Sequence, residues 1–341
     1  MDQSRRTALK SLAAASAAAA LPRFALGADA RVIKISHQFP GGTIDTGDFR
    51  DRLTRKFAAD VEKRTNGSLK FEIYPGSSLM KTVAQFSALR KGALDMSLYP
   101  LAYAGGEVQE LNIGLMPCMV TSYEQGFAWK KAEIGRELTK LLEAKGVKMV
   151  TWIWQAGGTA SRVNPIAEPG DVKGLKIRGG SREMDLMLKE AGGIISSVPS
   201  NEIYPAMQTG SLDAAVTSST SLISFRLEEI SKALTSGRGK SFWYMLEPLI
   251  MSKSVYDSLT PAQQKAVTDV GQELEGFATS SAKQDDVAVA DVYRKAGAKV
   301  ADMDDAVLSR WRKVAESAAW PDFAKRSADC ERYLKMAKAV A

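Results

Sequence analysis

Hydrophobic residues between positions 32 and 98 follow two different periods. Apolar alternation or short apolar runs predict strands at Val32–Ser36, Leu69–Tyr74 and Leu94–Leu98. A first helix is predicted between the first two strands, because apolar residues recur there at every fourth position: Phe49, Leu53, Phe57 and Val61. A second helix is predicted from Leu79 to Leu89 and ends at Gly92. This βαβαβ order predicts a mostly parallel sheet covered by helices.

The middle of the chain again alternates helices and strands. A helix at Ser122–Ala144 and a strand at Val147–Trp154 precede the polar, glycine-containing stretch Gln155–Ser161. We expect that stretch to cross into a second half of the molecule, and the apolar strand Trp243–Ser252 to return to the first. Four elements of the second half are predicted, in the order strand, helix, helix, strand: Leu175–Arg178, Arg182–Gly192, Ser200–Thr209 and Leu212–Val216.

A long helix is predicted after this return. Thr260 and Gln263 form a capping box with Pro261 at the first helical position, and the helical pattern can continue past Asp291. A helix of this length could brace both halves. The tail, residues 304–341, is also predicted to be helical.

One ten-residue pattern, aromatic-x-Ala-x-x-x-Gly-x-Leu-Asp, occurs twice, at Phe86–Asp95 and Tyr204–Asp213. Each copy is typical of a helix that stops at a glycine and leads into a strand. Such joints also recur by chance in α/β proteins. Two similar halves with a cleft between them are nevertheless the architecture of a protein that closes on a small ligand.

The N-terminus is typical of an export signal. Arg5 and Arg6 precede an Ala/Leu-rich stretch, Leu12–Leu21, that is too short to span a bilayer of about 30 Å. Small residues allow cleavage after Gly27 or Ala30. The twin-arginine route and the general secretory route both remain open. We therefore expect residues 1–28 to be an export signal and the mature protein to be periplasmic.

Charge and cysteine content exclude little beyond nucleic acid as a partner. The net charge of the whole chain is +7, and the leader contributes three of those charges. Basic and acidic residues are interspersed, without a basic run rich in aromatic residues, so we expect no nucleic-acid partner. The two cysteines, Cys118 and Cys330, could form a disulfide in the periplasm, although a buried free thiol suits the apolar surroundings of Cys118.

Signatures of enzymes are scarce. The chain has one histidine, His37, and cannot build a metal site from clustered His and Cys residues. It contains neither a G-x-S-x-G nor a phosphate-binding G-x-x-x-x-G-K-[ST] motif. His37 lies at a strand end, where a structural role or a position lining a cleft is expected. We therefore expect no enzymatic activity, no metal and no cofactor.

Two arginines are the main candidates for ligand binding. Arg178 closes a predicted strand, and ligands of open parallel sheets bind beyond the carboxyl ends of strands. A guanidinium there can hold a carboxylate through two parallel hydrogen bonds. Arg162 follows the predicted crossing and could place a second guanidinium on the same anion, although either arginine could instead be a surface charge.

Hydroxyl and aromatic residues complete the candidate site. Thr217 and Ser218 follow the strand Leu212–Val216, where they could bind ligand oxygens or cap the next helix. Three aromatic residues beside the predicted crossings could wall an apolar part of a ligand or pack the hinge: Trp154, Phe242 and Trp243.

Three segments give the chain a family resemblance: Asp171–Arg178, Glu202–Asp213 and Gly67–Leu79. With them, the chain resembles the periplasmic solute-binding subunits of tripartite ATP-independent periplasmic (TRAP) transporters, the DctP type. The resemblance implies two α/β domains, hinge strands that cross between them, a long helix bracing both, and delivery of an organic acid to integral membrane subunits. Arg178 matches the family's carboxylate-binding arginine, and Arg162 resembles a second, less constant one. An asparagine common in the family is absent near Thr217 and Ser218.

The resulting prediction is an α/β, two-domain periplasmic binding protein that captures a small organic acid. Domain I is expected at residues 29–157 and 245–285, and domain II at residues 158–244 and 286–341. The expected partners are an organic acid and the TRAP membrane subunits, and we expect a monomer. The alternatives are a binding subunit of an ATP-driven importer, an exported enzyme acting on an organic acid, and a periplasmic scaffold without a small ligand.

Overall fold

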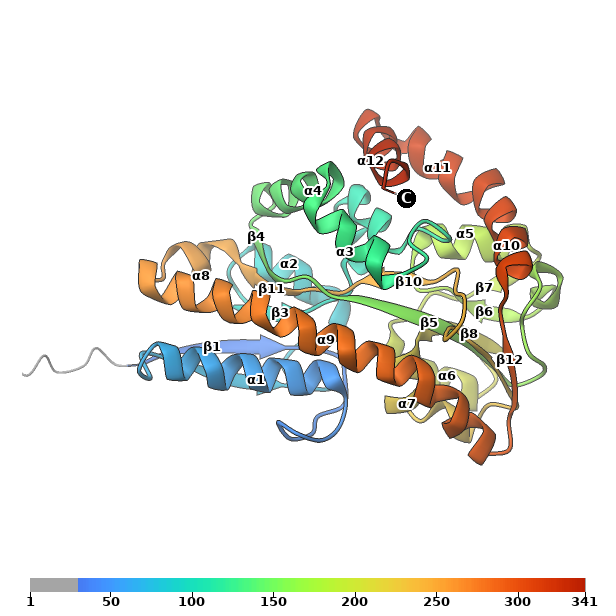
Figure 1. The fold of residues 1–341 in the computed structure, drawn as a ribbon, viewed down its shortest axis with the longest axis horizontal. Coiled ribbons are helices and arrows are strands. Elements are labelled where there is room, and N and C mark those ends of the chain that lie inside the picture. The colour runs from blue at the N-terminus through green and yellow to red at the C-terminus, as the bar shows by residue number, and fades with distance from the viewer. Residues whose placement is uncertain (1–29, 341) are drawn as a thin grey trace, which may run out of the picture.

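The computed structural model describes residues 30–340. The predicted export signal, residues 1–28, lies outside this part of the chain. Two β-sheets lie side by side with helices packed around them, and one long helix, α9, runs along both (Figure 1). This arrangement confirms the predicted α/β fold with two sheets and a bracing helix. The exact domain boundaries stay a prediction.

The first sheet contains five strands in the spatial order β2-β1-β3-β11-β4. Strand β1 runs parallel to β2 and β3, whereas β11 runs antiparallel to β3 and β4. The strands are β1 (Arg31–Ser36), β2 (Leu69–Tyr74), β3 (Met96–Leu98), β4 (Val147–Thr151) and β11 (Leu249–Ser252). The carboxyl ends of β1 and β3 therefore lie at the same edge of this sheet.

The second sheet has the order β12-β9-β5-β8-β6-β7, with β10 paired to β5. Strand β5 runs antiparallel to β8, β9 and β10, and β6 runs parallel to β8. The strands are β5 (Trp154–Ser161), β6 (Lys176–Arg178), β7 (Ile194–Ile195), β8 (Ala214–Ser218), β9 (Ala233–Ser236), β10 (Tyr244–Leu246) and β12 (Lys299–Asp302). The chain passes between the sheets from β4 to β5 and again from β10 to β11.

The helices pack against these two sheets or against one another. They are α1 (Phe49–Arg64), α2 (Gln85–Arg90), α3 (Tyr123–Lys131), α4 (Glu133–Ala144), α5 (Arg182–Glu190), α6 (Ile203–Gln208), α7 (Ser219–Ser224), α8 (Lys253–Asp257), α9 (Pro261–Lys295), α10 (Asp305–Ser317), α11 (Ala319–Arg326) and α12 (Ala328–Lys338). Residues 30–340 also contain six 3₁₀ helices: η1 (Thr82–Ala84), η2 (Leu101–Ala104), η3 (Gln109–Leu115), η4 (Pro169–Val172), η5 (Ser200–Glu202) and η6 (Leu227–Glu229).

Helix α9 has the capping box that the sequence predicts. The Thr260 side chain accepts from the backbone N–H of Gln263, and the Gln263 side chain accepts in return from the N–H of Thr260. The helix contacts α1 and β4 beside the first sheet and β9 and β12 in the second. The tail contacts both parts too, because α10 and α11 pack on α5 whereas α12 packs on α4 and η3.

The repeated sequence pattern forms the same joint in both sheets. Gly92 and Gly210 both have a positive φ, +69° and +78°, which glycine adopts without strain. The carboxylate of Asp95 accepts from the backbone N–H of Lys34 at 2.8 Å, and that of Asp213 accepts from the N–H of Lys176 at 2.9 Å. Each aspartate thus ties the strand it precedes to the neighbouring parallel strand.

Four predicted elements differ from the structure. The helix predicted from Leu79 begins only at Gln85, and Leu79 and Val83 are exposed. The helix predicted at residues 122–144 divides into α3 and α4 at Ala132. The strand predicted at residues 243–252 divides into β10 and β11 around Glu247. Residues 155–161, predicted as a polar crossing, belong to the fully buried strand β5.

Candidate ligand-binding site

Arg178 ends β6 with a guanidinium that is almost completely buried, at 1% exposure of the residue. Nε donates to the carbonyl oxygen of Val198 at 3.0 Å, and Nη1 donates to that of Val216 at 2.8 Å. Nη2 donates to the hydroxyl oxygen of Tyr103 at 2.7 Å. All three acceptors are uncharged oxygens, so these contacts orient the guanidinium and leave its charge uncompensated.

The carboxylate of Asp185 lies near Arg178 but accepts hydrogen bonds from other groups. It accepts from the backbone N–H of Gly179 at 2.9 Å and from the hydroxyl of Ser197 at 2.5 Å. Burial raises the pKa of this carboxyl, and the nearby Arg178 charge offsets part of that increase. Within residues 30–340, no salt bridge joins a carboxylate to Arg178. A buried cation without an anion is costly, so the site is suited to an anion from outside the chain.

Gly180 makes room for this guanidinium. Its φ is +97°, and a Cβ built on it would lie 2.7 Å from Nη1 of Arg178. A larger residue would therefore be strained in its backbone and would also displace the guanidinium. Gly180, the second glycine after Arg178 in the sequence, is thus part of the site.

Tyr103, on η2, connects Arg178 to the elements around the first sheet. Its hydroxyl oxygen accepts from Arg178 and also from the backbone N–H of Ser200 at 3.1 Å. Its ring packs edge to face on Tyr99, with the ring centroids 6.1 Å apart. A cavity of about 420 Å³ adjoins Tyr103 and includes Val83, Ser181 and Val198 in its lining. The hydroxyl of one residue therefore bridges the two sides of the site.

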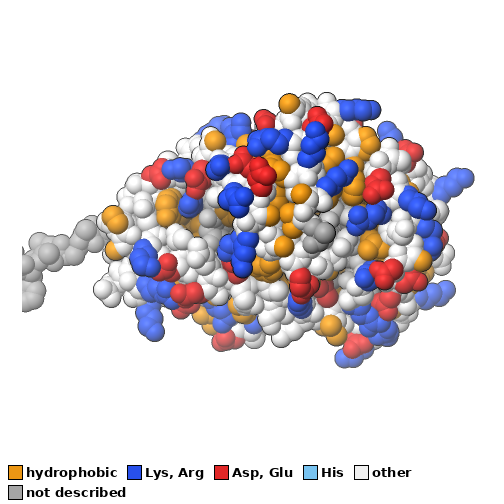
Figure 2. Space-filling model, turned by 45° about the horizontal axis from the view of Figure 1, so that its top comes forward, with side chains coloured by type: hydrophobic (Ala, Val, Ile, Leu, Met, Phe, Trp, Pro, Cys, Tyr) orange, Lys and Arg blue, Asp and Glu red, His pale blue; other side chains and the backbone are white. Residues whose placement is uncertain are grey.

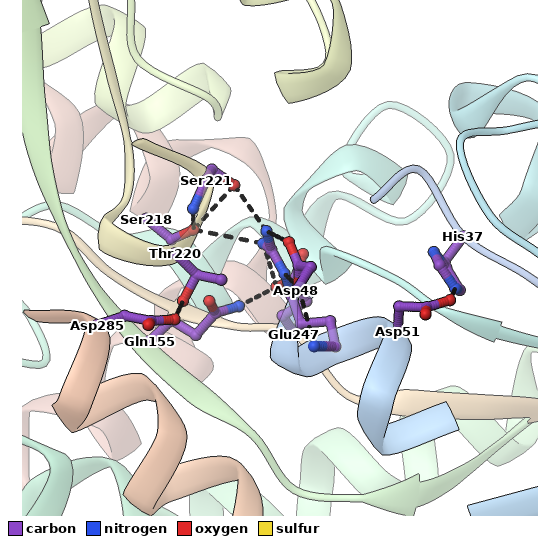
Figure 3. A network of polar contacts seen from close by, with 10 residues as sticks. His37, Asp48, Asp51, Gln155, Ser218, Thr220, Ser221, Glu247 and Asp285 are labelled. Carbon is purple, nitrogen blue, oxygen red and sulfur yellow. Dashed lines mark hydrogen bonds and ion pairs between the residues drawn. The ribbon is translucent and has the colours of Figure 1, made fainter. Parts of the chain in front are cut away.

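A second buried guanidinium is that of Arg50, on α1. Its partners Asp48, Ser218, Ser221 and Glu247 are labelled in the polar network of Figure 3. The guanidinium donates to both carboxylate oxygens of Asp48, at 2.9 and 2.7 Å, and to Glu247 at 3.3 Å. It also donates to the hydroxyls of Ser218 at 3.4 Å and Ser221 at 3.1 Å. Burial works against its charge, yet Asp48 and Glu247 raise the pKa of Arg50 above its ordinary value.

Glu247 lies where the chain passes from β10 to β11. It is completely buried, and burial raises its pKa to about 7, although Arg50 works in the opposite direction. Its Oε2 accepts from the side-chain amide of Gln155 on β5, and its Oε1 has no partner among the described residues. The network therefore joins four places: α1, the start of β5, the connection between β10 and β11, and the start of α7.

The polar residues predicted for the site lie in different parts of the structure and do not all surround Arg178. His37 is buried, with Nε2 3.1 Å from the carboxylate of Asp51. Ser218 caps α7 by accepting from the N–H of Ser221 and also contacts Arg50. Thr217 is buried in β8, opposite Gly158. Arg162 follows β5 beside the start of β8, where its N–H donates to the carbonyl of Asp213. Its Nη1 lies beside Gly210, and among the described residues its side chain shares no hydrogen-bond partner with Arg178.

The predicted aromatic residues are all buried and make packing contacts. Trp154 packs edge to face on Trp129, with centroids 5.3 Å apart. Phe242 packs on Trp311 of α10, with centroids 4.7 Å apart. The indole N–H of Trp243 donates to the carbonyl of Gly179 at 3.2 Å, immediately after Arg178. Of the three, Trp243 has a direct contact with the loop that follows the arginine.

Sequence reasoning missed the network around Arg50. The partners of Arg50 come from three separate segments, and no spacing in the sequence links residue 50 with residues 218, 221 and 247. The motif Asp48-Phe49-Arg50 does resemble a helix start with an acidic cap, and Asp48 indeed accepts from the N–H of Arg50. That signal predicts a helix end and gives no hint that the arginine is buried.

The structure gives several further findings. Cys118 and Cys330 are both buried free thiols. No group of three or more His, Cys, Asp or Glu residues that could hold a metal is found within residues 30–340. No helix in the same range is long and apolar enough to cross a membrane. Basic and acidic side chains are intermingled on the face drawn in Figure 2.

Comparison with known protein families matches residues 46–326 to the DctP model of bacterial extracellular solute-binding proteins, family 7. The protein belongs to this family. A solute-binding protein of Albidiferax ferrireducens is 58% identical over 334 residues, which cover 98% of each chain. The C4-dicarboxylate-binding periplasmic protein DctP of Rhodobacter capsulatus is 28% identical, over 78% of each chain. The chain is thus a periplasmic solute-binding protein rather than an enzyme.

Solved structures agree with this family. A TRAP periplasmic solute-binding protein of Rhodoferax ferrireducens, crystallised with bound malonate, is 60% identical and superposes with a TM-score of 0.89, covering 90% of this chain and 98% of the other. A TRAP solute-binding protein of a Sulfitobacter species, with bound β-D-galacturonate, superposes with a TM-score of 0.82 at 22% identity, covering 91% and 100% of the two chains. At that identity, the second comparison shows the fold alone.

Proposed function

We propose that this solute-binding protein captures a small organic acid whose carboxylate binds Arg178, closes around it, and delivers it to the integral membrane subunits of a TRAP transporter. The observation that carries this proposal is the buried guanidinium of Arg178, whose described acceptors are three uncharged oxygens. A carboxylate would supply the missing negative charge and accept the remaining N–H groups.

Contacts across the site support closure of two domains around the acid. Arg178 belongs to the second sheet, whereas Tyr103 and Arg50 come from elements beside the first. The bond from Arg178 to Tyr103 and those from Arg50 to Ser218 and Ser221 would break if the sheets moved apart. Binding that draws these groups together would shift the protein towards its closed state.

Two relatives support the class of ligand. The Rhodoferax protein, 60% identical to this chain, holds malonate, and the Rhodobacter relative is named for C4-dicarboxylates. Both ligands carry carboxylates. An acid of this size, with one carboxylate on Arg178, is therefore the ligand we propose. Function as a monomer is part of the same proposal.

Titration calorimetry with malonate as the probe tests the role of Arg178. Replacement by alanine, Arg178→Ala, is expected to weaken binding at least about thirtyfold, because truncating one partner of a buried charged pair costs about 2–5 kcal/mol. Arg294→Ala is the matched control, since Arg294 is exposed near the end of α9 and pairs with Asp291. Equal malonate affinity of wild type and Arg178→Ala would refute the proposed site.

Arg162 needs its own variant, because the sequence predicts a ligand contact that the structure does not bring to Arg178. If Arg162→Ala binds malonate as wild type does, the second guanidinium of the sequence prediction has no role in binding. A loss comparable to that of Arg178→Ala would restore the prediction and require a different arrangement of the second sheet.

A further inference from the structure

Two buried polar side chains at the edge of the first sheet lack hydrogen-bond partners. Gln38 follows β1 and is 2% exposed, and Tyr99 follows β3 and is 0% exposed. Neither amide atom of Gln38 nor the hydroxyl of Tyr99 has a partner among the residues that the structure describes. Buried polar groups are normally paired, because an unpaired one has lost its hydrogen bonds to water without replacement. A group from outside the chain is therefore expected to meet them.

The strand register places these two residues side by side. Strands β1 and β3 are parallel neighbours in which Ser36 lies opposite Ser97. Gln38 and Tyr99 each follow this last pair by two residues, so both lie just beyond the carboxyl ends of neighbouring parallel strands. Ligands of open α/β sheets bind at such carboxyl ends. The unpartnered amide and phenol thus belong to the same edge of the first sheet, and the two residues are called the Gln38–Tyr99 cluster below.

The same cluster adjoins the proposed carboxylate site. The Tyr99 ring packs on Tyr103, whose hydroxyl accepts from Arg178. Phe39, the neighbour of Gln38, lies under the guanidinium of Arg50, with Cζ 3.6 Å from the ring centroid. The ring of Tyr103 therefore lies between Tyr99 and Arg178, the arginine that would hold the carboxylate.

The charges next to the cluster are balanced within the protein. His37 contacts the carboxylate of Asp51, and Arg50 is paired with Asp48 and Glu247. A second carboxylate placed against Gln38 would find the Arg50 cation already compensated. It would also leave the amide oxygen of Gln38 unpaired, because a carboxylate or a keto group accepts hydrogen bonds and cannot donate one. A hydroxyl group can do both.

We propose that Gln38 and Tyr99 form a subsite for a hydroxyl group on the acid whose carboxylate binds Arg178. The solute is then a hydroxycarboxylate, with its carboxylate against the second sheet and its hydroxyl against the first. This inference rests on the proposed function and narrows the class of acid that the protein selects.

Two series of acids test the subsite on the wild-type protein by titration calorimetry. Each series keeps one carboxylate and changes the other end from methyl to hydroxymethyl to carboxylate: propanoate, 3-hydroxypropanoate and malonate, then butanoate, 4-hydroxybutanoate and succinate. In at least one series, the hydroxy acid is expected to bind about fivefold or more tightly than its methyl counterpart, which corresponds to the roughly 1 kcal/mol that one satisfied hydrogen bond contributes.

Two conservative variants then connect the preference to the residues. Tyr99→Phe and Gln38→Met are each expected to bring the hydroxy-to-methyl affinity ratio close to one while the methyl acid keeps its affinity. That retained affinity shows that the variant is folded. If a variant does not fold, the wild-type series still decides.

The outcomes separate the subsite from the proposed function. Equal affinities for hydroxy and methyl acids in both series would overturn the subsite, as would diacids that bind more tightly than the hydroxy acids in both. A preference for hydroxy acids that survives in both variants would place the hydroxyl elsewhere and also overturn it. Failure of all six acids to bind wild type, or binding that survives in Arg178→Ala, would overturn the proposed function itself.

Discussion

The hydroxyl oxygen of Tyr103 accepts hydrogen bonds from both Nη2 of Arg178, at 2.7 Å, and the backbone N–H of Ser200, at 3.1 Å. Tyr103 lies on η2, beside the first sheet, whereas both donors belong to the part of the chain that builds the second. One oxygen atom thus orients the candidate carboxylate-binding group and joins the two sides of the site.

Loss of this hydroxyl is expected to weaken ligand binding. In Tyr103→Phe, the ring remains, but Arg178 and Ser200 each lose an acceptor in a buried place, so malonate affinity should fall by about tenfold. The matched control is Tyr74→Phe, because the Tyr74 hydroxyl contacts the Glu72 side chain at the edge of the first sheet. Calorimetric titration of both variants measures the difference, and equal affinities would show that the bridge has no role in binding.

Removal of Arg50 is expected to destabilise the fold strongly. Arg50→Met leaves the buried carboxylates of Asp48 and Glu247 without their cation, which should lower the free energy of unfolding by about 3–5 kcal/mol. Arg64→Met breaks an exposed pair with Glu273 and should cost less than about 1 kcal/mol. Urea denaturation compares the two, and similar losses would mean that the buried network contributes little to stability.

The stability of the protein should depend on the protonation of Asp286, on α9. Burial raises the pKa of this carboxyl from 3.8 to about 6, although the hydrogen bond from the Tyr123 hydroxyl at 2.6 Å works in the opposite direction. The folded protein therefore holds this proton more firmly than the unfolded chain. Its stabilising effect is complete below about pH 4 and is lost as the pH rises through about 6.

Asp286→Asn removes this proton-dependent contribution. Relative to wild type, the variant should gain about 1–3 kcal/mol in the free energy of unfolding between pH 4 and pH 7, because its side chain stays neutral. Asp291→Asn, at an exposed position of the same helix, serves as the control. Urea denaturation at a series of pH values decides, and parallel curves for wild type and Asp286→Asn would contradict the prediction.

Two glycines of α9 should respond in opposite directions to alanine. A Cβ on Gly271 would lie 2.4 Å from the carbonyl oxygen of Val150, so Gly271→Ala should separate the helix from β4 and destabilise the protein. A Cβ on Gly276 meets nothing within 4 Å, so Gly276→Ala should stabilise it by about 0.5–1 kcal/mol through helix propensity. Thermal melts of both variants suffice, and changes of the same sign would contradict this assignment.

The sequence predicts those parts of the fold that depend on local period and turn chemistry. The stripe of Phe49, Leu53, Phe57 and Val61 is buried on α1 as expected. The repeated glycine–aspartate joint forms in both sheets, and Arg178 stands at the end of its strand. These features are predictable because each follows from residues close together in the chain.

The sequence does not predict contacts that depend on distant segments. The glycines of residues 155–161 suggest a polar loop, yet these residues form strand β5. Position 157 of this strand holds a glycine because a Cβ there would lie 2.4 Å from both the Trp243 ring and the Thr217 carbonyl oxygen. The burial of Arg50 likewise depends on partners from residues 218, 221 and 247. Where close approach rather than period selects a residue, local pattern gives the wrong element or none.

The 35-residue length of α9 has a mechanical consequence. At about 1.5 Å per residue, the helix is a single rod about 52 Å long that touches both sheets. If one sheet rotates relative to the other, a straight α9 can keep its contacts with only one sheet and must shift along the other. The buried residues near its middle are small: Ala278, Ser281 and Ala282. Because these side chains are small, they interdigitate little with the elements beneath the helix and would oppose its sliding only weakly.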